Sequence, residues 1–384
     1  MSEAADVVVV GAGIVGAACA RVCARRGLRT VVIDGHGIGG GATAAGMGHI
    51  VAMDDSPAQL ALTAYSQRLW RKMAADLPPE AEFDTCGTLW VAADEDGMAE
   101  VRRKQSVYAS AGIATEILDA AALAETEPEL RRPLPGALLV PGDAVLYPPC
   151  AAAFLMREAE RAGATLLPGQ TAASAGRGRV RLENGTEVAA ARIVIATGAD
   201  ATRLVPGLPV RRRRGHLVIT DRYPGWVRHQ LVELGYLKSA HSLTTDSVAF
   251  NVQPRRTGQL LIGSSREYGA ESSQVNRALL AAMLSRAQAY LPGIGRLDAI
   301  RVWTGFRAAT PDKLPLIGSW PPDSTLWLAT GHEGLGITTS VGTAELLAAE
   351  ILGETSEISA EPYSPGRFAS WSETGSAEPE ESHV

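Results

Sequence analysis

The chain has 384 residues, of which 46% are hydrophobic and 20% charged, and its formal net charge at pH 7 is -6. This length and composition are typical of a globular protein with two domains. A net acidic chain does not suit a nucleic-acid partner, because neutralising phosphates requires a basic face. The N-terminal apolar run Val7–Val10 is too short for a signal peptide or a membrane span. We therefore expect a cytoplasmic protein without a transmembrane segment, and peripheral docking at the inner face of the membrane stays open.

The four cysteines are too few and too scattered for a disulfide framework or a metal quartet, which fits a reducing compartment and predicts no metal. Cys19 and Cys23 lie one helical turn apart. We interpret them as small buried thiols facing a sheet, with pairing or metal ligation as the alternative.

The opening pattern predicts a βαβ unit, with strands over Asp6–Val10 and Thr30–Asp34 and a helix over Ile14–Arg26. A second glycine-rich segment, GHGIGGGATAAGMG, follows at residues 35–48. The next helical pattern runs from Pro57 to about Leu77, where prolines end it.

Residues 85–127 predict a separate lobe with one strand and two helices, at 85–93, 98–111 and 120–127. The chain then has the pattern of a helix from Pro149 to Gly163 and of a buried strand over Thr165–Leu167. Short strands follow around 171–187, where Asn184-Gly185 predicts a hairpin, and a β-branched strand covers 192–196.

From about 211 to 300 the pattern predicts antiparallel strands (HLVIT, VAFNVQP and QLLIGSS) and one long helix over 274–291. The last section has a PDKLPLIG turn, a strand over 325–329 and a helix over 337–352. Each predicted domain is thus assembled from separated segments.

A dinucleotide-binding fingerprint occupies the first turn, where Gly11-Ala12-Gly13-Ile14-Val15-Gly16 reads G-x-G-x-x-G. Gly11 allows the tight turn, Gly13 lets the backbone approach a pyrophosphate, and Gly16 allows close helix packing. Asp34 closes the next strand, where a carboxylate accepts hydrogen bonds from the adenosine ribose. A purely structural glycine turn is the alternative.

Three further motifs follow in order, namely GGGATAAGMGH (39–49), IVIATGA (193–199) and the pair GFRAATPDKLPLIG and GHEGLGI. With the fingerprint, they resemble the FAD-dependent family that contains D-amino acid oxidase, glycine oxidase and sarcosine oxidase, over residues 5–368. Within it, the chain most resembles the FAD subunit of bacterial D-hydroxyproline dehydrogenases.

The resemblance implies an α/β protein in which a glutathione-reductase-like, Rossmann-type FAD-binding domain interleaves with an α+β substrate domain built on an antiparallel sheet. We assign residues 1–82, 142–210 and 301–369 to the FAD-binding domain and residues 83–141 and 211–300 to the substrate domain. Residues 370–384 have almost no apolar side chains and predict a disordered tail.

The resemblance also implies which residues hold FAD. Besides the fingerprint residues Gly11, Gly13, Ile14, Val15, Gly16 and Asp34, they are Thr43, Ala44, Gly46, Met47, Thr197, Gly198, Gly331, His332, Gly334, Leu335, Gly336 and Ile337. A helix beginning after GHEGLG would point its N-terminus at the flavin and stabilise negative charge on it. Residues 306–311 lack the cysteine of covalent relatives, so we expect non-covalent FAD, with His332 as the alternative attachment site.

Three residues are implied on the substrate side. Arg307 stands where relatives place the arginine that binds the substrate carboxylate, and an ion pair with Asp312 is the alternative. His49 should lie near the substrate edge of the flavin unless it is structural. Asn251 takes the place of a tyrosine, and Gly334 that of an arginine found in some glycine oxidases, so glycine is a less secure substrate.

The run Arg211–Arg214 has two interpretations. The arginines are solvated or paired with acids, or they bind the phosphate of an FMN at a subunit interface, as in multi-subunit relatives.

The resulting hypothesis is oxidation of a small amino or imino acid, with cis-4-hydroxy-D-proline or D-proline as the leading substrate. The amine binds deprotonated, Arg307 holds the carboxylate, and a hydride passes from Cα to flavin N5 without a dedicated protein base. Electrons then pass to dioxygen, a quinone, or a partner iron–sulfur or second flavoprotein subunit. The alternatives are a glycine or sarcosine oxidase that makes hydrogen peroxide, a non-catalytic FAD-binding subunit, and, more distantly, a nicotinamide dehydrogenase.

Overall fold

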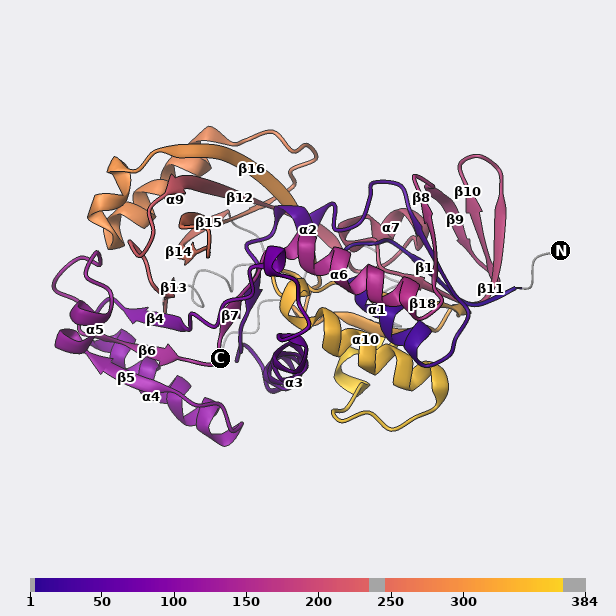
Figure 1. Cartoon of the computed structure of the whole chain (residues 1–384), viewed down its shortest axis with the longest axis horizontal. Helices are drawn as coiled ribbons and strands as arrows, with labels where there is room; N and C mark the ends of the chain where they lie inside the picture. Colours follow the sequence, from indigo (N-terminus) through magenta and orange to yellow (C-terminus); the bar gives the residue numbers. More distant parts are fainter. Residues whose placement is uncertain (1–3, 235–245, 369–384) are drawn as a thin grey trace.

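The computed structural model describes residues 4–234 and 246–368, so the expected tail at 370–384 lies outside the described residues. Two eight-stranded sheets form the two lobes seen in Figure 1. Chain segments alternate between the sheets.

The first sheet has the strand order β17-β18-β11-β1-β2-β8, and a β9–β10 hairpin extends β11. Its central strands are parallel. The strands are β1 (Ala5–Val10), β2 (Thr30–Asp34), β8 (Thr165–Pro168), β9 (Ala172–Gly176), β10 (Arg179–Leu182), β11 (Glu187–Ile195), β17 (Leu316–Trp320) and β18 (Asp323–Thr330).

Both faces of the first sheet are buried, which explains the unbroken apolar run of β1. Val7 and Val9 pack against helices α1 (Ile14–Arg25), α6 (Pro148–Arg161) and α10 (Gly336–Leu352). Val8 and Val10 face the opposite core, which the β9–β10 hairpin and α7 (Ala201–Leu204) help to close.

The second sheet has the order β16-β12-β15-β14-β13-β4-β6-β5. Its neighbours are antiparallel except for β13 and β4. The strands are β4 (Thr88–Ala92), β5 (Glu116–Asp119), β6 (Gly136–Val140), β12 (Arg211–Arg222), β13 (Gln230–Glu233), β14 (Ser247–Pro254), β15 (Gln259–Tyr268) and β16 (Ala299–Ala309).

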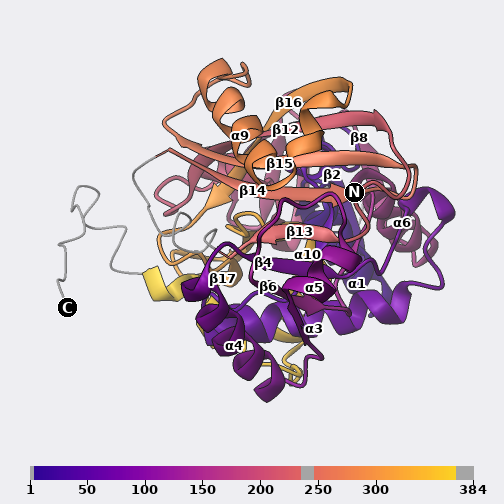
Figure 2. The same cartoon turned by 90° about the vertical axis from the view of Figure 1, so that its left-hand side faces the viewer.

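Helices cover this second sheet unevenly. Helix α9 (Arg277–Tyr290) packs on β14 and β15 (Figure 2), where Phe250 stacks on Tyr290. Helices α4 (Glu95–Ser110) and α5 (Ala120–Thr126) pack on β4, β5 and β6. The alternation of strand residues gives β14 an apolar face toward α9 and leaves its other face free to line a site.

Several elements lie between or beside the sheets. They are α2 (Ala42–Ala45), α3 (Pro57–Met73), the two-stranded pair of β3 (His49–Ile50) and β7 (Ala144–Val145), and short 3₁₀ turns at Pro79–Ala81, Gly198–Asp200, Pro292–Arg296, Glu361–Tyr363 and Pro365–Phe368. Among residues 4–234 and 246–368 there is no helix with the length and apolar character to cross a membrane.

Cys19 and Cys23 are free thiols on α1, and both are buried in the core, as we interpreted them. Burial raises the pKa of Cys23 to about 12. The Asn184-Gly185 hairpin is also confirmed, since it joins β10 to β11 and Gly185 has a φ of 86°.

Four expectations from the sequence are corrected. Strand β8 is an edge strand without a buried residue, because only β2 pairs with it among the described strands. Helix α3 ends at Met73, before Leu77, and helix α9 begins after Asn276, whose side chain caps it, rather than at Gln274. We assigned residues from 301 on to the FAD-binding domain. Strand β16 nevertheless belongs to the second sheet, because it pairs with β12 from Arg211 to Thr220.

Asp143 provides a test of the packing between the lobes. Its buried carboxylate accepts hydrogen bonds from the Ala52 amide (3.2 Å) and the Gln67 side chain (2.6 Å). Burial raises its pKa from 3.8 to about 6, so the wild type should lose stability as the pH rises through this window. Asp143→Asn keeps an acceptor without the charge.

We therefore expect the stability of Asp143→Asn to improve relative to the wild type by up to about 1.4 kcal/mol per pH unit within this window. Thermal unfolding of both proteins from pH 4 to 8 measures the difference. A difference that does not change with pH would contradict the assignment.

Candidate functional site

A cavity of about 650 Å³ lies between the lobes, a size suited to a cofactor or small ligand. The implied substrate-side residues Arg307, His49 and Asn251 all line it. So do fifteen of the implied cofactor residues, while Gly16, Ala44 and Gly331 lie outside its lining. The fifteen are Gly11, Gly13, Ile14, Val15, Asp34, Thr43, Gly46, Met47, Thr197, Gly198, His332, Gly334, Leu335, Gly336 and Ile337.

The first glycine turn leaves no room for side chains. A Cβ at Gly16 would lie 1.8 Å from the carbonyl oxygen of Gly11, and one at Gly11, whose φ is 108°, would lie 2.6 Å from the carbonyl oxygen of Ala196. Gly16 therefore acts by letting α1 cross β1 closely, which explains why it does not line the cavity.

Asp34 organises this turn through the backbone. One carboxylate oxygen accepts from the Ala12 amide (2.7 Å), and the other accepts from the His36 (2.7 Å) and Gly37 (2.6 Å) amides. The expected hydrogen bonds to a ribose would thus be added to three that Asp34 already accepts from the main chain.

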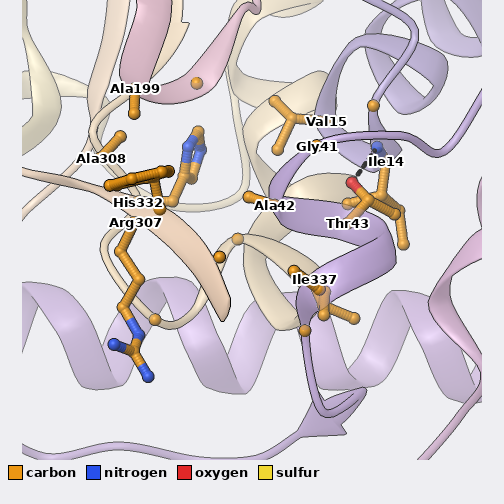
Figure 3. Close-up of a pocket in the computed structure, with 18 of the residues that line it drawn as sticks. Ile14, Val15, Gly41, Ala42, Thr43, Ala199, Arg307, Ala308, His332 and Ile337 are labelled. Atoms are coloured by element: carbon orange, nitrogen blue, oxygen red, sulfur yellow. Dashed lines mark hydrogen bonds between the residues drawn. The ribbon is translucent and has the colours of Figure 1, made fainter. Parts of the chain in front are cut away.

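Thr43 links the second glycine-rich segment to the start of α1. Its hydroxyl accepts a hydrogen bond from the Ile14 amide at 3.0 Å (Figure 3), so it caps a helix whose Gly13 has no side chain to do so. Gly46 lies against α10, where a Cβ would come within 2.7 Å of the Ile337 side chain.

The loop before α10 joins the two parts of the cavity. His332 is buried and its Nε2 is hydrogen-bonded to the Thr343 hydroxyl at 2.9 Å, so this ring nitrogen already has a partner. Gly336 and Ile337, the first residues of α10, line the cavity, which brings the positive end of the helix dipole to it. Figure 3 shows His332 and Ile337 between Arg307 and the pair Ile14 and Thr43.

These features fit a dinucleotide. The glycine cradle leaves backbone amides at the N-terminus of α1, where a pyrophosphate binds favourably. The buried hydroxyl of Thr197 also lines the cavity and has no hydrogen-bond partner among the described residues, so it can bind a cofactor.

Arg307 crosses the second sheet to reach the other end of the cavity. It extends from β16 over Gly215 of β12 and donates to the Ser265 carbonyl of β15 at 2.9 Å. A Cβ at residue 215 would lie 2.4 Å from Nη1 of Arg307, so glycine at this position makes room for the guanidinium. Asp312 is the alternative partner that the sequence suggested for Arg307. Its carboxylate instead accepts hydrogen bonds from Nε (2.7 Å) and Nη2 (3.2 Å) of Arg367.

Two of the three histidines that line the cavity, His49 and His332, are neutral near pH 7. Burial, together with the positive charge of Arg307, lowers the pKa of His49 from 6.5 to about 4. Burial lowers the pKa of His332 to about 3. His49 and His332 therefore add no charge to the cavity at this pH.

Arg266 and Lys313 are cavity cations that we did not single out from the sequence. Lys313 has a lowered pKa because of burial and the nearby Arg266 and Arg213, which Asp55 opposes. Arg213 forms an ion pair with Glu333. Cations thus outnumber acids at the end of the cavity that contains Arg307, and this favours an anionic ligand group.

Sequence reasoning also missed Trp90, Gln230 and Ser264, which line the cavity beside Asn251. Gln230 follows Arg228 and His229, and Ser264 stands between Gly263 and Ser265, so neither was marked as a polar residue in an apolar strand. Trp90 lies in the apolar run TLWVA, so its sequence context does not distinguish it from a core residue.

Three of the four residues in the arginine run are paired with acids, as one of the two interpretations expected. Arg212 pairs with Asp200, Arg213 with Glu333 and Arg214 with Glu267. An FMN phosphate would compete with these carboxylates, so this part of the structure lends the FMN interpretation no support.

Thr43→Val tests the cap on α1. Removing the hydroxyl leaves the Ile14 amide without its acceptor, so we expect a loss of about 1 kcal/mol in the free energy of unfolding. Chemical denaturation measures it, and Thr43→Ser, which keeps the hydroxyl, is the matched control. Equal stability of both variants would contradict the capping role.

His49 should titrate with a pKa of about 4 rather than near 6.5. Proton NMR of the imidazole, assigned with His49→Gln, measures this value. Because Arg307 contributes to the lowering, Arg307→Met should raise the pKa. An unchanged pKa in that variant would contradict the proximity of the two side chains.

Comparisons with known proteins agree with this geometry. The family model described as "FAD dependent oxidoreductase" (DAO) matches residues 6–350. Glycine oxidase from Geobacillus kaustophilus is 28% identical, covering 95% of this chain and 97% of its own. Its crystal structure superimposes with a TM-score of 0.85 over 95% of this chain and 99% of that one.

Two further relatives extend over nearly the whole chain. The hydrogen cyanide synthase subunit HcnC from Pseudomonas aeruginosa is 26% identical over 96% of this chain and 97% of its own. The structure of L-proline dehydrogenase from P. horikoshii has a TM-score of 0.84, covering 96% of this chain and 99% of that one at 22% identity, and shows the same fold.

The match to the family model over most of the chain, the shared fold and the glycine cradle lead to one conclusion: this chain belongs to the DAO family of FAD-dependent oxidoreductases, enzymes that act on the carbon–nitrogen bond of amino acid donors.

Proposed function

We propose that this enzyme oxidises a small amino or cyclic imino acid to the corresponding imino acid, with cis-4-hydroxy-D-proline and D-proline as the first candidates. The observation that carries the proposal is the position of Arg307, whose guanidinium lies over Gly215 in the cation-rich end of the cavity. A planar guanidinium binds a carboxylate through two parallel hydrogen bonds and so fixes its orientation.

The residues of the chain position the substrate for the reaction. Arg307 binds the substrate carboxylate and thereby directs Cα toward the first residues of α10. Bound FAD supplies the redox chemistry by accepting a hydride from Cα at N5. The N-terminus of α10 would stabilise the negative charge that a bound flavin acquires when it is reduced. Neutral His49 adds no charge beside the amine, which binds in its deprotonated form.

Each of the two proposed domains corresponds to one of the two sheets. The first sheet with α1, α6 and α10 forms the FAD-binding domain, and the second sheet, including β16, forms the substrate domain. FAD is bound non-covalently, because residues 306–311 contain no cysteine and Nε2 of His332 is engaged by Thr343.

The electron acceptor is proposed to be a partner subunit, and the location the cytoplasm. The relative HcnC is a subunit of a larger enzyme, which supports a partner. The glycine oxidase relatives support the second candidate function, an oxidase that releases hydrogen peroxide. A non-catalytic flavin subunit is the third candidate.

Anaerobic mixing of the FAD-loaded enzyme with single substrates distinguishes these functions. We expect cis-4-hydroxy-D-proline or D-proline to bleach the visible flavin band rapidly, with slow recovery in air. Bleaching by glycine or sarcosine with fast recovery would replace the proposal with the oxidase. If neither L-proline nor any of the other four acids bleaches the flavin, the amine-oxidising proposal is wrong.

Arg307→Met tests the carboxylate contact. Loss of this charge-assisted contact should lower kcat/KM by about 100-fold or more while FAD content stays unchanged. Arg301→Met, on the same strand but exposed and stacked on Trp303, is the matched control and should retain activity. Gly215→Ala should lower kcat/KM in the same direction, because its methyl group would displace the guanidinium.

Steady-state kinetics with one imino acid, together with the flavin absorbance of each purified variant, measures these effects. Equal kcat/KM in Arg307→Met and Arg301→Met would remove Arg307 from the site.

A further inference from the structure

A group of buried polar side chains on the second sheet faces the cavity without using all its hydrogen-bonding atoms. Trp90 and Gln230 are each 2% exposed, Ser264 is 4% and Asn251 is 6%. Their Nε1, Oε1, Oγ and Oδ1 atoms, respectively, have no hydrogen-bond partner in the described part of the chain. Buried polar atoms left unpaired cost stability, so such a group in a cavity points to a ligand.

The strand register places Trp90, Gln230 and Asn251 on one face of the second sheet. Asn251 on β14 lies opposite Gly263 on β15 and opposite Val232 on β13, and Val232 lies opposite Trp90 on β4. Gln230 shares the face of Val232, two residues away on the same strand. These three residues therefore form a row that crosses β14, β13 and β4 on the face opposite α9.

Arg307 lies at one end of this row, because its guanidinium donates to Ser265 on β15. Strands are spaced about 4.8 Å apart, so β13 is about 10 Å from β15. With a hydrogen bond of about 2.8 Å at each end, roughly 4 Å separates the carboxylate of a ligand from a polar group bound at β13. A small amino or imino acid with a polar group on its side chain or ring spans this distance.

The chemistry of the far end specifies the polar group. The indole Nε1 of Trp90 is a donor only, and Oε1 of Gln230 is an acceptor, since its Nε2 already donates to Thr88 at 3.2 Å. A single ligand group that satisfies both must accept one hydrogen bond and donate another. A neutral hydroxyl does both, whereas a carboxylate only accepts and an ammonium only donates.

The Trp90 ring is fixed from behind by a buried lysine. The Lys104 ammonium lies 4.2 Å from the centre of the Trp90 ring, contacts Tyr108 at 3.3 Å and pairs with Asp54. A cation held against its face restrains the indole, so the direction of its N–H is set before a ligand binds.

We propose that Trp90 and Gln230 form a hydroxyl-binding subsite, which makes the enzyme selective for hydroxylated amino or imino acids over their deoxy analogues. This inference rests on the proposed function and deepens it, because it assigns the substrate hydroxyl to named residues. A site built to bind a hydroxyl rejects the analogue without it, since its own polar atoms then stay unpaired.

The test compares cis-4-hydroxy-D-proline with D-proline in the FAD-loaded wild type and in Trp90→Phe, which removes the N–H donor and keeps a smaller aromatic ring. We expect the wild type to reduce its flavin with at least about 100-fold higher kcat/KM for the hydroxylated acid. Trp90→Phe should lower this ratio by about 10-fold or more, mainly through a loss of kcat/KM for the hydroxylated acid. Gln230→Met provides a second variant with the same expectation.

Trp327→Phe is the matched control. Trp327 on β18 is also a buried tryptophan whose Nε1 lacks a partner among residues 4–234 and 246–368, but it does not line the cavity. This variant should keep the wild-type ratio. If Trp327→Phe lowers the kcat/KM ratio of the two acids as much as Trp90→Phe does, the effect is one of general packing and the subsite is wrong.

Failure of the subsite and failure of the proposed function give different results. If both acids reduce the flavin equally well, or Trp90→Phe and Gln230→Met keep the full preference, oxidation stands and the subsite is wrong. If neither acid reduces the flavin, the proposed function fails, and the subsite is then tested by thermal stabilisation. Stronger stabilisation of the wild type by the hydroxylated acid, lost in Trp90→Phe, supports it, and equal stabilisation by both acids overturns it.

Discussion

The Asp34 carboxylate ties together the backbone on which the cofactor end of the site depends. It joins the end of β2 to the Ala12 amide in the first glycine turn and to the His36 and Gly37 amides in the next loop. Charge-assisted hydrogen bonds of this kind are stronger than neutral ones. The second glycine-rich segment is then attached through Thr43, which caps α1 at Ile14. The nucleotide cradle is thus held by two side chains that act on main-chain amides.

The substrate end depends on a different constraint, the two-residue period of β-strands. Phe250 and Val252 face α9, and Asn251 between them faces the cavity. The same alternation brings Gln230 and Trp90 to that face from neighbouring strands. Arg307 joins them only because Gly215 leaves the sheet surface open beneath its guanidinium. The carboxylate contact that we propose for Arg307 therefore depends on a glycine one strand away as well as on the arginine.

The nucleotide-binding half was predictable because its signals are local. The glycine spacing, the flanking strands and Asp34 all lie within residues 5–34, and the βαβ unit is as expected. The edge position of β8 and the sheet membership of β16 were not predictable from local pattern, since an apolar run does not show which strand will pair with it. The ion pairs of the arginine run were not predictable either, because acids such as Glu267 and Glu333 are distant in the sequence and only folding brings them near.

The sequence by itself determined the nucleotide-binding turn, because its glycine spacing has a direct physical purpose. Through the resemblance of its ordered motifs to a known family, it also indicated the cofactor and the arginine expected to bind a carboxylate. Only the tertiary structure brought Trp90, Gln230, Asn251 and Ser264, from positions up to 174 residues apart, to one cavity with Arg307. Their strand pairings are long-range, and a polar residue in an isolated strand pattern does not reveal which cavity it will face. The physical reason is that sheet register, unlike a glycine turn, is decided by the whole fold.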